Sequence, residues 1–259
     1  MITRQHAYLL TQLVKRDLQA RYKGSLLGGV WLIGQPLLLL AVYSLVFGVV
    51  FEARGLPTDS AVPFPLFFFA GLIIHQAMAE VLMRTPGLIR SHSSYVTKIV
   101  FPLWLLPVMT VATALVSLCL QLLILLAAML LWHIPIPATV LWLPILLAGY
   151  ALTLLATAWL VSALGVFLPD LTQIMGLVAT ALLFLSPVFY TAEHLPEPVR
   201  DYAAFNPLVW PIESLRDALY TATLPALLPT LAYLALMAVA AIISLALFRR
   251  MRPAFADIL

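Results

Sequence analysis

Six stretches of the chain contain no Asp, Glu, Lys or Arg and are separated by polar connections. They cover residues 30–51, 62–79, 102–132, 140–167, 174–191 and 226–248. Since a helix needs about 20 mainly apolar residues to cross a bilayer, each stretch predicts a transmembrane helix. The prolines of HIPIP, residues 133–137, predict a tight turn between the third and fourth stretches. The expected fold is an all-α, polytopic membrane protein in which residues 1–259 form a single transmembrane domain.

Residues 4–23, before the first stretch, have a different pattern. Leu10, Val14 and Leu18 recur every four residues, while Lys15 and Arg16 fall on another side of the helical wheel. This pattern predicts an amphipathic helix that lies in the cytoplasmic interface of the membrane. Such a helix serves either as a plain anchor or as an element that docks a soluble partner.

The connection at residues 84–98 is longer than a plain turn. Pro86 and Gly87 break the preceding helix, and SHSS at 91–94 offers N-caps for a new short helix near Ser93 or Ser94. The segment is therefore expected to form a short helix-turn-helix on the cytoplasmic side.

Residues 192–224 are too polar and too rich in proline to cross the membrane, yet aromatic and aliphatic residues recur through them. Ile212, Leu215 and Leu219 share one helical face, and Glu213 and Arg216 lie on others. We interpret the segment as two short helices that re-enter the outer leaflet. Irregular backbone at such depth is tolerated only where it is buried in protein or lines a cavity, which favours the outer mouth of a pathway. A soluble cap on the outer surface is the alternative.

The distribution of basic residues orients the chain. Six spans place both termini on one side, and that side carries eleven of the fourteen Lys and Arg residues. The positive-inside rule then places both termini in the cytoplasm. Arg21, Tyr22, Lys23 and Trp31 are expected to anchor the chain at the inner headgroups, or else to act only as a topology signal.

The composition agrees with a membrane protein and excludes several functions. Of the 259 residues, 63% are hydrophobic and 10% are charged, the mean hydropathy is +1.05, and a net charge of +3 does not indicate nucleic acid in such a chain. No G-x-x-x-x-G-K-[ST] motif occurs, so we do not expect the chain to bind ATP itself. No H-E-x-x-H or G-x-S-x-G motif occurs either, and we expect no catalytic site, metal or bound cofactor. Cys119 is expected to be a packing residue, and no cleavable signal peptide is expected at the N-terminus.

Aromatic residues in the spans and in residues 192–224 are candidates for the lining of a channel or gate, because their flat faces suit sugar rings. They are Tyr43, Phe47, Phe184, Phe189, Tyr190, Tyr202, Phe205 and Trp210.

Four motifs, in this order along the chain, resemble those of a known family. They are RYKGSLLGGVWLIGQP at 21–36, KIVFP at 98–102, SPVFY at 186–190 and NPLVWPIESLRDALY at 206–220. They are similar to segments of the membrane subunits of type 2 ABC exporters for polysaccharides such as O-antigen, capsule and teichoic acid. The resemblance extends to the length of the chain and the order of its six spans.

This resemblance implies a homodimer of six-span subunits, with two separate ATPase subunits that bind ATP and Mg²⁺ on the cytoplasmic side. It implies that the 4–23 helix and the 84–98 segment receive the ATPase stroke and that residues 192–224 form an outer gate. The residues expected to dock the ATPase are Arg16, Arg84, Gly87, Leu88, Arg90, Ser91, His92 and Lys98.

The leading hypothesis is a transmembrane subunit that exports a lipid-linked glycan, with O-antigen as the first choice, across the bacterial inner membrane. A type 2 exporter of drugs or lipo-oligosaccharides is a second reading. A membrane-embedded transferase is a third, for which His194 and Asp201 are the nearest candidate pair. An ion-driven carrier would need ionisable residues at mid-membrane depth, and the one candidate in a span is His75.

Overall fold

The structure of the protein is a computed structural model that describes residues 4–46, 62–97, 101–191 and 206–258. Within these ranges the regular structure is helical and no strand occurs, so the predicted all-α class is confirmed for them. The α-helices there are α1 (Arg4–Tyr22), α2 (Trp31–Tyr43), α3 (Phe64–Arg84), α4 (Leu88–Ser91), α5 (Ser93–Thr97), α6 (Leu105–Leu131), α7 (Leu143–Phe167), α8 (Leu171–Leu185), α10 (Val209–Arg216), α11 (Leu227–Met251) and α12 (Phe255–Ile258). Short 3-10 turns cover Gly28–Val30, Ala138–Trp142 and Arg252–Ala254, and a π-helical turn covers Asp217–Thr221.

Five helical segments of the described chain are long and apolar enough to cross a membrane. They are Gly28–Val46, Phe64–Arg84, Leu105–Leu131, Ala138–Phe167 and Leu227–Ala254. They correspond to the first, second, third, fourth and sixth predicted stretches. The turn predicted at 133–137 separates Leu105–Leu131 from Ala138–Phe167.

The fifth predicted stretch, 174–191, corresponds to the shorter helix α8. With 15 residues, α8 reaches roughly 22 Å, less than the thickness of a hydrocarbon core. It ends because Ser186 precedes Pro187 and adopts extended backbone with ψ 155°, as residues before proline do. Hydropathy alone extended this span too far, because SPVFY is apolar but not helical.

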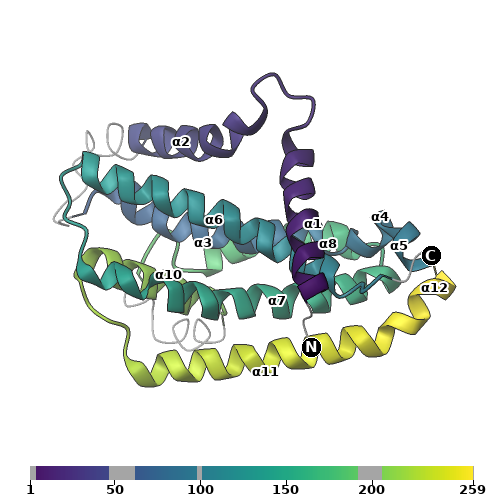
Figure 1. Ribbon diagram of the computed structural model, residues 1–259. Helices are drawn as coiled ribbons and strands as arrows, with labels where there is room; N and C mark the ends of the chain where they lie inside the picture. The colour runs from purple at the N-terminus through teal and green to yellow at the C-terminus, as the bar shows by residue number, and fades with distance from the viewer. Residues whose placement is uncertain (1–3, 47–61, 98–100, 192–205, 259) are drawn as a thin grey trace.

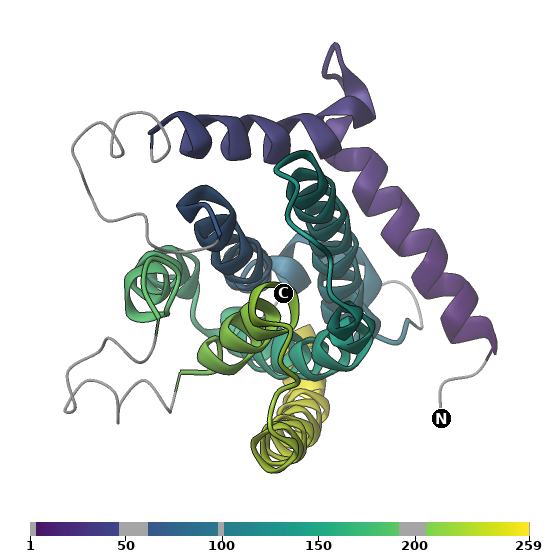
Figure 2. The same ribbon diagram turned by 90° about the vertical axis from the view of Figure 1, so that its left-hand side faces the viewer.

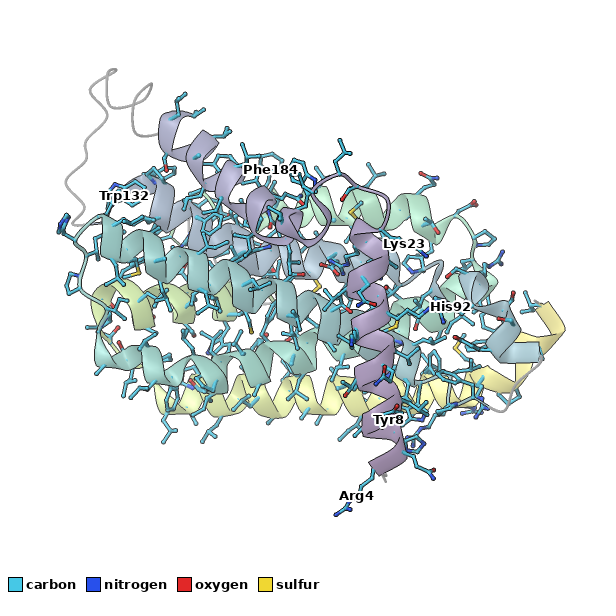
Figure 3. All side chains as sticks on the ribbon, turned by 45° about the horizontal axis from the view of Figure 1, so that its top comes forward. Arg4, Tyr8, Lys23, His92, Trp132 and Phe184 are labelled. Atoms are coloured by element: carbon cyan, nitrogen blue, oxygen red, sulfur yellow. The ribbon has the colours of Figure 1, made fainter. Side chains whose placement is uncertain are left out.

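The long helices lie side by side, with α3 near the centre of the bundle (Figures 1 and 2). α6, α7 and α8 pack against α3, α11 packs along α7, and α2 lies on the opposite side of the bundle from α11. One end of the bundle, the α4 end, carries α4, α5 and α12. The other, the α10 end, carries α10 and the first turn of α3. His92 and Trp132 mark these opposite ends in Figure 3.

Helix α1 runs across the long helices rather than along them (Figure 1). It packs on α6 near the α4 end, where the His6 and Trp104 rings are 5.6 Å apart. Leu10, Leu13 and Val14 of its apolar face contact a buried cluster at this end of the bundle. Arg4, in its first turn, projects away from the bundle (Figure 3). The apolar side of α1 is thus covered in part by the protein's own core.

The loop after α3 is held tightly against the end of α7. Gly165 of α7 faces Pro86, and a Cβ added to this glycine would lie 2.6 Å from Pro86 Cα. Nearby, Arg90 donates from Nη2 to the carbonyl oxygen of Val166 at 2.7 Å. The loop before α4 can therefore pack this closely on α7 only because residue 165 is a glycine and has no side chain.

We expect Gly165→Ala to lower the stability by about 1–3 kcal/mol, because the added methyl overlaps the backbone of Pro86. The measurement is the thermal unfolding midpoint of the purified protein in detergent. Gly176→Ala in α8 is the matched control, since nothing lies within 4 Å of its added Cβ, and it should be neutral or slightly stabilising. Equal midpoints for the two variants would contradict the close approach.

Candidate functional site

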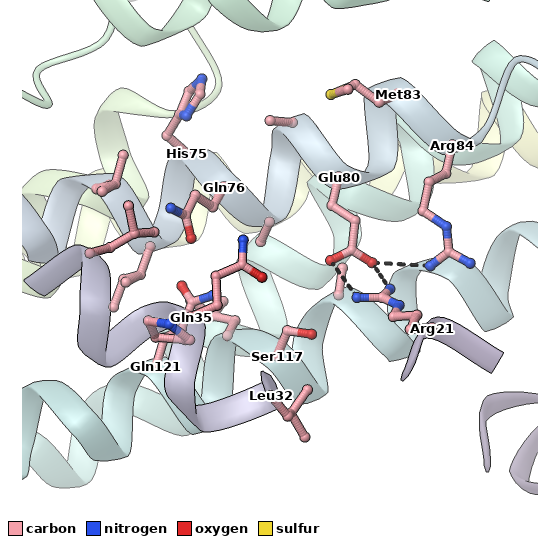
Figure 4. A pocket seen from close by; sticks show the side chains of 18 of the residues that line it. Arg21, Leu32, Gln35, His75, Gln76, Glu80, Met83, Arg84, Ser117 and Gln121 are labelled. Atoms are coloured by element: carbon pink, nitrogen blue, oxygen red, sulfur yellow. Dashed lines mark hydrogen bonds and ion pairs between the residues drawn. The ribbon is translucent and has the colours of Figure 1, made fainter. Parts of the chain in front are cut away.

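Four charged side chains, the four-charge network, join α1 to the end of α3. Arg84 donates to Asp17 at 2.5 Å and to Glu80 at 3.1 Å. Arg21 donates to Glu80 from both terminal nitrogens, one of them at 3.2 Å, and its Nε lies 3.8 Å from Asp17. Figure 4 shows Glu80 between the two guanidinium groups. The side chains are only 15% to 29% exposed, and their charges sum to zero.

Both arginines of the network also carry predictions from the sequence, Arg21 as a headgroup anchor and Arg84 as a docking residue. These stay predictions, and the structure adds that each arginine has an acidic partner within the chain. The partners meet because α3 continues beyond the predicted end at residue 79 and closes with Arg84. This extension brings Glu80 and Arg84 onto one helical face, an i and i+4 pair that meets α1.

A cavity of about 450 Å³, the glutamine cavity, lies beside the network between α2, α3 and α6. Gln35 of α2, Gln76 of α3 and Gln121 of α6 line it, together with Ser117 and the Arg21–Glu80 pair. Figure 4 shows the three amide side chains converging from their three helices. The Gln121 Oε1 atom is buried and has no hydrogen-bond partner among the described residues. The cavity thus combines an apolar wall with three carboxamide side chains, one of which has a buried oxygen without a partner there.

His75 lies midway along α3, and its ring points away from the glutamines (Figure 4). Its Nε2 is 2.8 Å from the carbonyl oxygen of Ala179 in α8, so Nε2 carries the proton in this hydrogen bond. Nδ1 is buried with no partner among the described residues. His75 therefore links α3 to α8.

Several predicted channel aromatics come together where α2, α3 and the end of α8 meet. Tyr43 packs edge-on against Phe68 at 4.6 Å, Phe68 contacts Phe189 at 4.9 Å, and Phe189 stacks on Phe184 at 5.7 Å between ring centroids. Phe184 is 63% exposed, and Tyr190 donates its hydroxyl to the Phe184 carbonyl at 3.0 Å. We call this group the aromatic cluster.

Trp210 lies apart from the aromatic cluster. Its ring stacks on Tyr233 of α11 at 4.2 Å and lines a second cavity of about 450 Å³ between α10 and α11. The Trp210 Nε1 atom is buried without a partner in the described parts of the chain. The remaining predicted channel residues lie outside the described residues: Phe47, Tyr202 and Phe205.

Arg216 of α10 fixes the chain that follows α8. Its side chain is 4% exposed and donates to the carbonyl oxygens of Pro187 at 2.6 Å, Val188 at 2.8 Å and Tyr190 at 3.1 Å. It also donates to the carbonyl of Phe67 in α3 at 3.2 Å, and its guanidinium carbon lies 3.6 Å from the Phe67 ring centre. Sequence reasoning had only placed Arg216 off the apolar face of its helix.

The charge of Arg216 is maintained at this buried position. Burial lowers its pKa to about 10, and Glu213, 3.5 Å away, opposes the decrease. The guanidinium therefore stays protonated at neutral pH. Gly71 of α3 permits this approach, because an added Cβ would lie 2.8 Å from Arg216 Nη2 and 3.0 Å from Val188 Cα.

The predicted docking segment contains the short helices α4 and α5. Leu88 is buried, while Arg90 and Ser91 are exposed and His92 is half-buried. His92 donates from Nδ1 to the Leu88 carbonyl oxygen at 2.9 Å, and its ring stacks on Tyr95. Of the other predicted docking residues, Gly87 precedes α4, Arg16 is exposed on α1, and Lys98 lies outside the described residues.

The predicted anchor residues surround the turn between α1 and α2. Lys23 is exposed and Trp31 is 38% exposed, whereas the Tyr22 side chain lies outside the described residues. Gly24 with φ 91° and Gly28 with φ 50° adopt left-handed backbone in this turn. Glycine accepts that conformation without steric cost, which explains two glycines of the RYKGSLLGG motif.

Comparison with known proteins identifies the family. Residues 8–220 match the family model described as ABC-2 type transporter. The chain belongs to the ABC-2 type transporters. It is 31% identical over 256 residues to an O-antigen export system permease protein RfbA of Myxococcus xanthus, covering 98% of this chain and 96% of that protein. Two proteins of the same name from Klebsiella pneumoniae are each 25% identical, covering 97% of this chain and 95% of theirs.

As an ABC-2 permease subunit, the chain is a membrane component and not an enzyme itself.

Sequence reasoning missed the glutamine cavity and the Asp17 and Glu80 positions of the four-charge network. The available signal was the presence of Gln35, Gln76 and Gln121 within apolar helices, where polar side chains are costly unless they have partners. The meeting of these three residues was not predictable from the sequence, because 41 residues separate Gln35 from Gln76 and 45 separate Gln76 from Gln121.

Proposed function

We propose that this ABC-2 chain is the transmembrane subunit of an ATP-driven exporter that moves lipid-linked O-antigen polysaccharide across the bacterial inner membrane. Two copies would form a homodimer that binds two separate ATPase subunits, which hold the ATP and Mg²⁺. The observation that carries this proposal is the 31% identity, over 98% of the chain, to a permease named for O-antigen export.

We further propose six crossings with both termini in the cytoplasm, in which α8 together with residues 186–191 serves as the fifth crossing and α10 belongs to a re-entrant outer gate. The Lys and Arg residues of α1, of α4 and of the junction between α11 and α12 support this orientation, since α4 and that junction lie at the α4 end and α1 crosses the bundle near it (Figure 1). The transverse direction of α1 is that expected for a helix in the membrane interface (Figure 1).

In this arrangement the exposed side of α4 would meet the ATPase subunit, and α3 would carry its motion toward the membrane interior. The aromatic cluster and Arg216 lie at the other end of α3. Opening of the gate would then require movement of residues 186–190, which Arg216 holds through three carbonyl oxygens.

We expect Arg90→Glu to reduce stimulation of the partner ATPase about tenfold, because a reversed charge in an interface is strongly unfavourable. The measurement is ATP hydrolysis by the reconstituted complex with and without glycan-producing membranes. Arg90→Gln is the matched control, since it retains a donor for the Val166 carbonyl and removes only the charge. Normal coupling in the Arg90→Glu complex would remove this residue from the docking surface.

The test of the proposed function is deletion of the gene in its own bacterium. Surface glycans are then separated on a gel, and lipid-linked polymer retained in the cytoplasm is measured. Loss of one long-chain glycan with accumulation inside the cell, both restored by the wild-type gene, is the expected result. An unchanged glycan profile would overturn glycan export and leave the ABC-2 family assignment intact.

A further inference from the structure

We propose that the glutamine cavity binds a neutral, hydroxyl-rich sugar unit of the cargo, with Gln35, Gln76 and Gln121 as its hydrogen-bonding groups. The identity of the cargo as a glycan rests on the proposed function. The site itself rests on the geometry between α2, α3 and α6.

The first argument is the unmet hydrogen-bonding capacity of the cavity. Gln121 Oε1 is buried without a partner among the described residues, while Gln76 is half-buried and Gln35 is exposed where they line the cavity. Buried polar groups without partners are rare, and each calls for a ligand or ordered water. A carboxamide both donates and accepts, as a sugar hydroxyl does, so the two groups match in chemistry.

The second argument is the charge of the lining. Arg21 and Arg84 are the cations of the cavity, and both are already paired with Glu80. A phosphate would have to displace these carboxylate contacts, whereas a neutral sugar would not. The cavity therefore favours an uncharged sugar over the diphosphate end of a lipid-linked polymer.

The third argument is size and position. A volume of about 450 Å³ lies within the range of about 300–1,000 Å³ typical of small-molecule sites. Leu39 and Leu72 of its lining are one helical turn from Tyr43 and Phe68 of the aromatic cluster. Along α2 and α3, the polar groups of the cavity therefore lie toward the α4 end, and the rings of the aromatic cluster follow toward the α10 end.

The test uses the full complex in cells that produce the glycan. The photo-crosslinking amino acid p-benzoylphenylalanine replaces Gln76 in one strain, Phe189 in a second, and Ile243 in a third. Ile243 is the control, because it is 61% exposed on α11. After irradiation, the purified chain is probed for attached glycan before and after mild acid, which cleaves sugar diphosphates. We expect acid-resistant glycan on the Gln76 variant and none on the Ile243 variant.

Glycan attached at Phe189 but not at Gln76 would overturn the cavity site and leave the proposed function standing. Glycan at Gln76 that mild acid removes would mean that the lipid end fills the cavity, which also overturns the sugar site. Absence of glycan at both positions, with an unchanged glycan profile in the deletion strain, would overturn the proposed function itself.

A second variant avoids the bulk of the photo-crosslinker. Gln76→Leu combined with Gln121→Leu keeps the side-chain size and removes two hydrogen-bonding groups, so export should fall about tenfold while the protein level stays unchanged. Gln173→Leu on the exposed start of α8 is the matched control and should export normally. Normal export by the double variant would show that the cavity holds only water.

Discussion

Arg216→Leu is expected to abolish export and to lower the stability of the subunit by about 3–5 kcal/mol. The substitution removes every donor that Arg216 supplies to Phe67, Pro187, Val188 and Tyr190 and leaves their carbonyl oxygens buried. The chain after α8 would then lose its attachment to α3. The measurements are the thermal unfolding midpoint in detergent and glycan export in the complemented deletion strain.

Two controls separate this role from a general loss of charge. Arg216→Lys keeps the charge but lacks the planar set of five donors, so it should recover only part of the stability. Arg249→Leu removes an exposed arginine at the end of α11 and should leave the midpoint unchanged. An Arg216→Leu subunit with the wild-type midpoint would show that these contacts do not hold the gate.

Glu80→Gln is expected to disconnect α1 from α3 and to reduce coupled export strongly, with a loss of about 1–3 kcal/mol in stability. The glutamine keeps the size of the side chain but leaves Arg21 and Arg84 with Asp17 as their shared carboxylate. The loss is smaller than for Arg216 because the network is partly exposed. Export in the complemented strain and the unfolding midpoint of the purified subunit are the measurements.

A double-mutant cycle tests whether the network acts as a unit. The loss of stability in the double variant Asp17→Asn/Glu80→Gln should differ clearly from the sum of the losses in the two single variants. The reason is that both carboxylates contact the same two arginines. Lys15→Gln, an exposed charge on α1, is the control and should have no effect on either measurement. Additive effects of the two network variants would contradict the coupling.

The candidate site was predictable only in part. Among the predicted channel aromatics, Tyr43 and Phe189 each contact Phe68, and Phe184 contacts Phe189, whereas their role in a channel stays a prediction. The role of Arg216 was not predictable, because a helical wheel shows which face a residue occupies but not which distant carbonyl oxygens that face meets. The pairing of Glu80 with Arg21 was not predictable either, because hydropathy ended the second span at residue 79, before Glu80, whereas α3 continues to Arg84.

By itself the sequence determined the membrane class of this protein, its helical content and five of its long helices. Each of these follows from the lengths of the apolar stretches in the sequence, since a helix satisfies its own backbone hydrogen bonds wherever it is placed. Only the tertiary structure decided the four-charge network, the convergence of three glutamines and the attachment of residues 186–190 to Arg216. Those features join residues up to 86 positions apart, the separation of Gln35 and Gln121, and the packing of whole helices sets their distances.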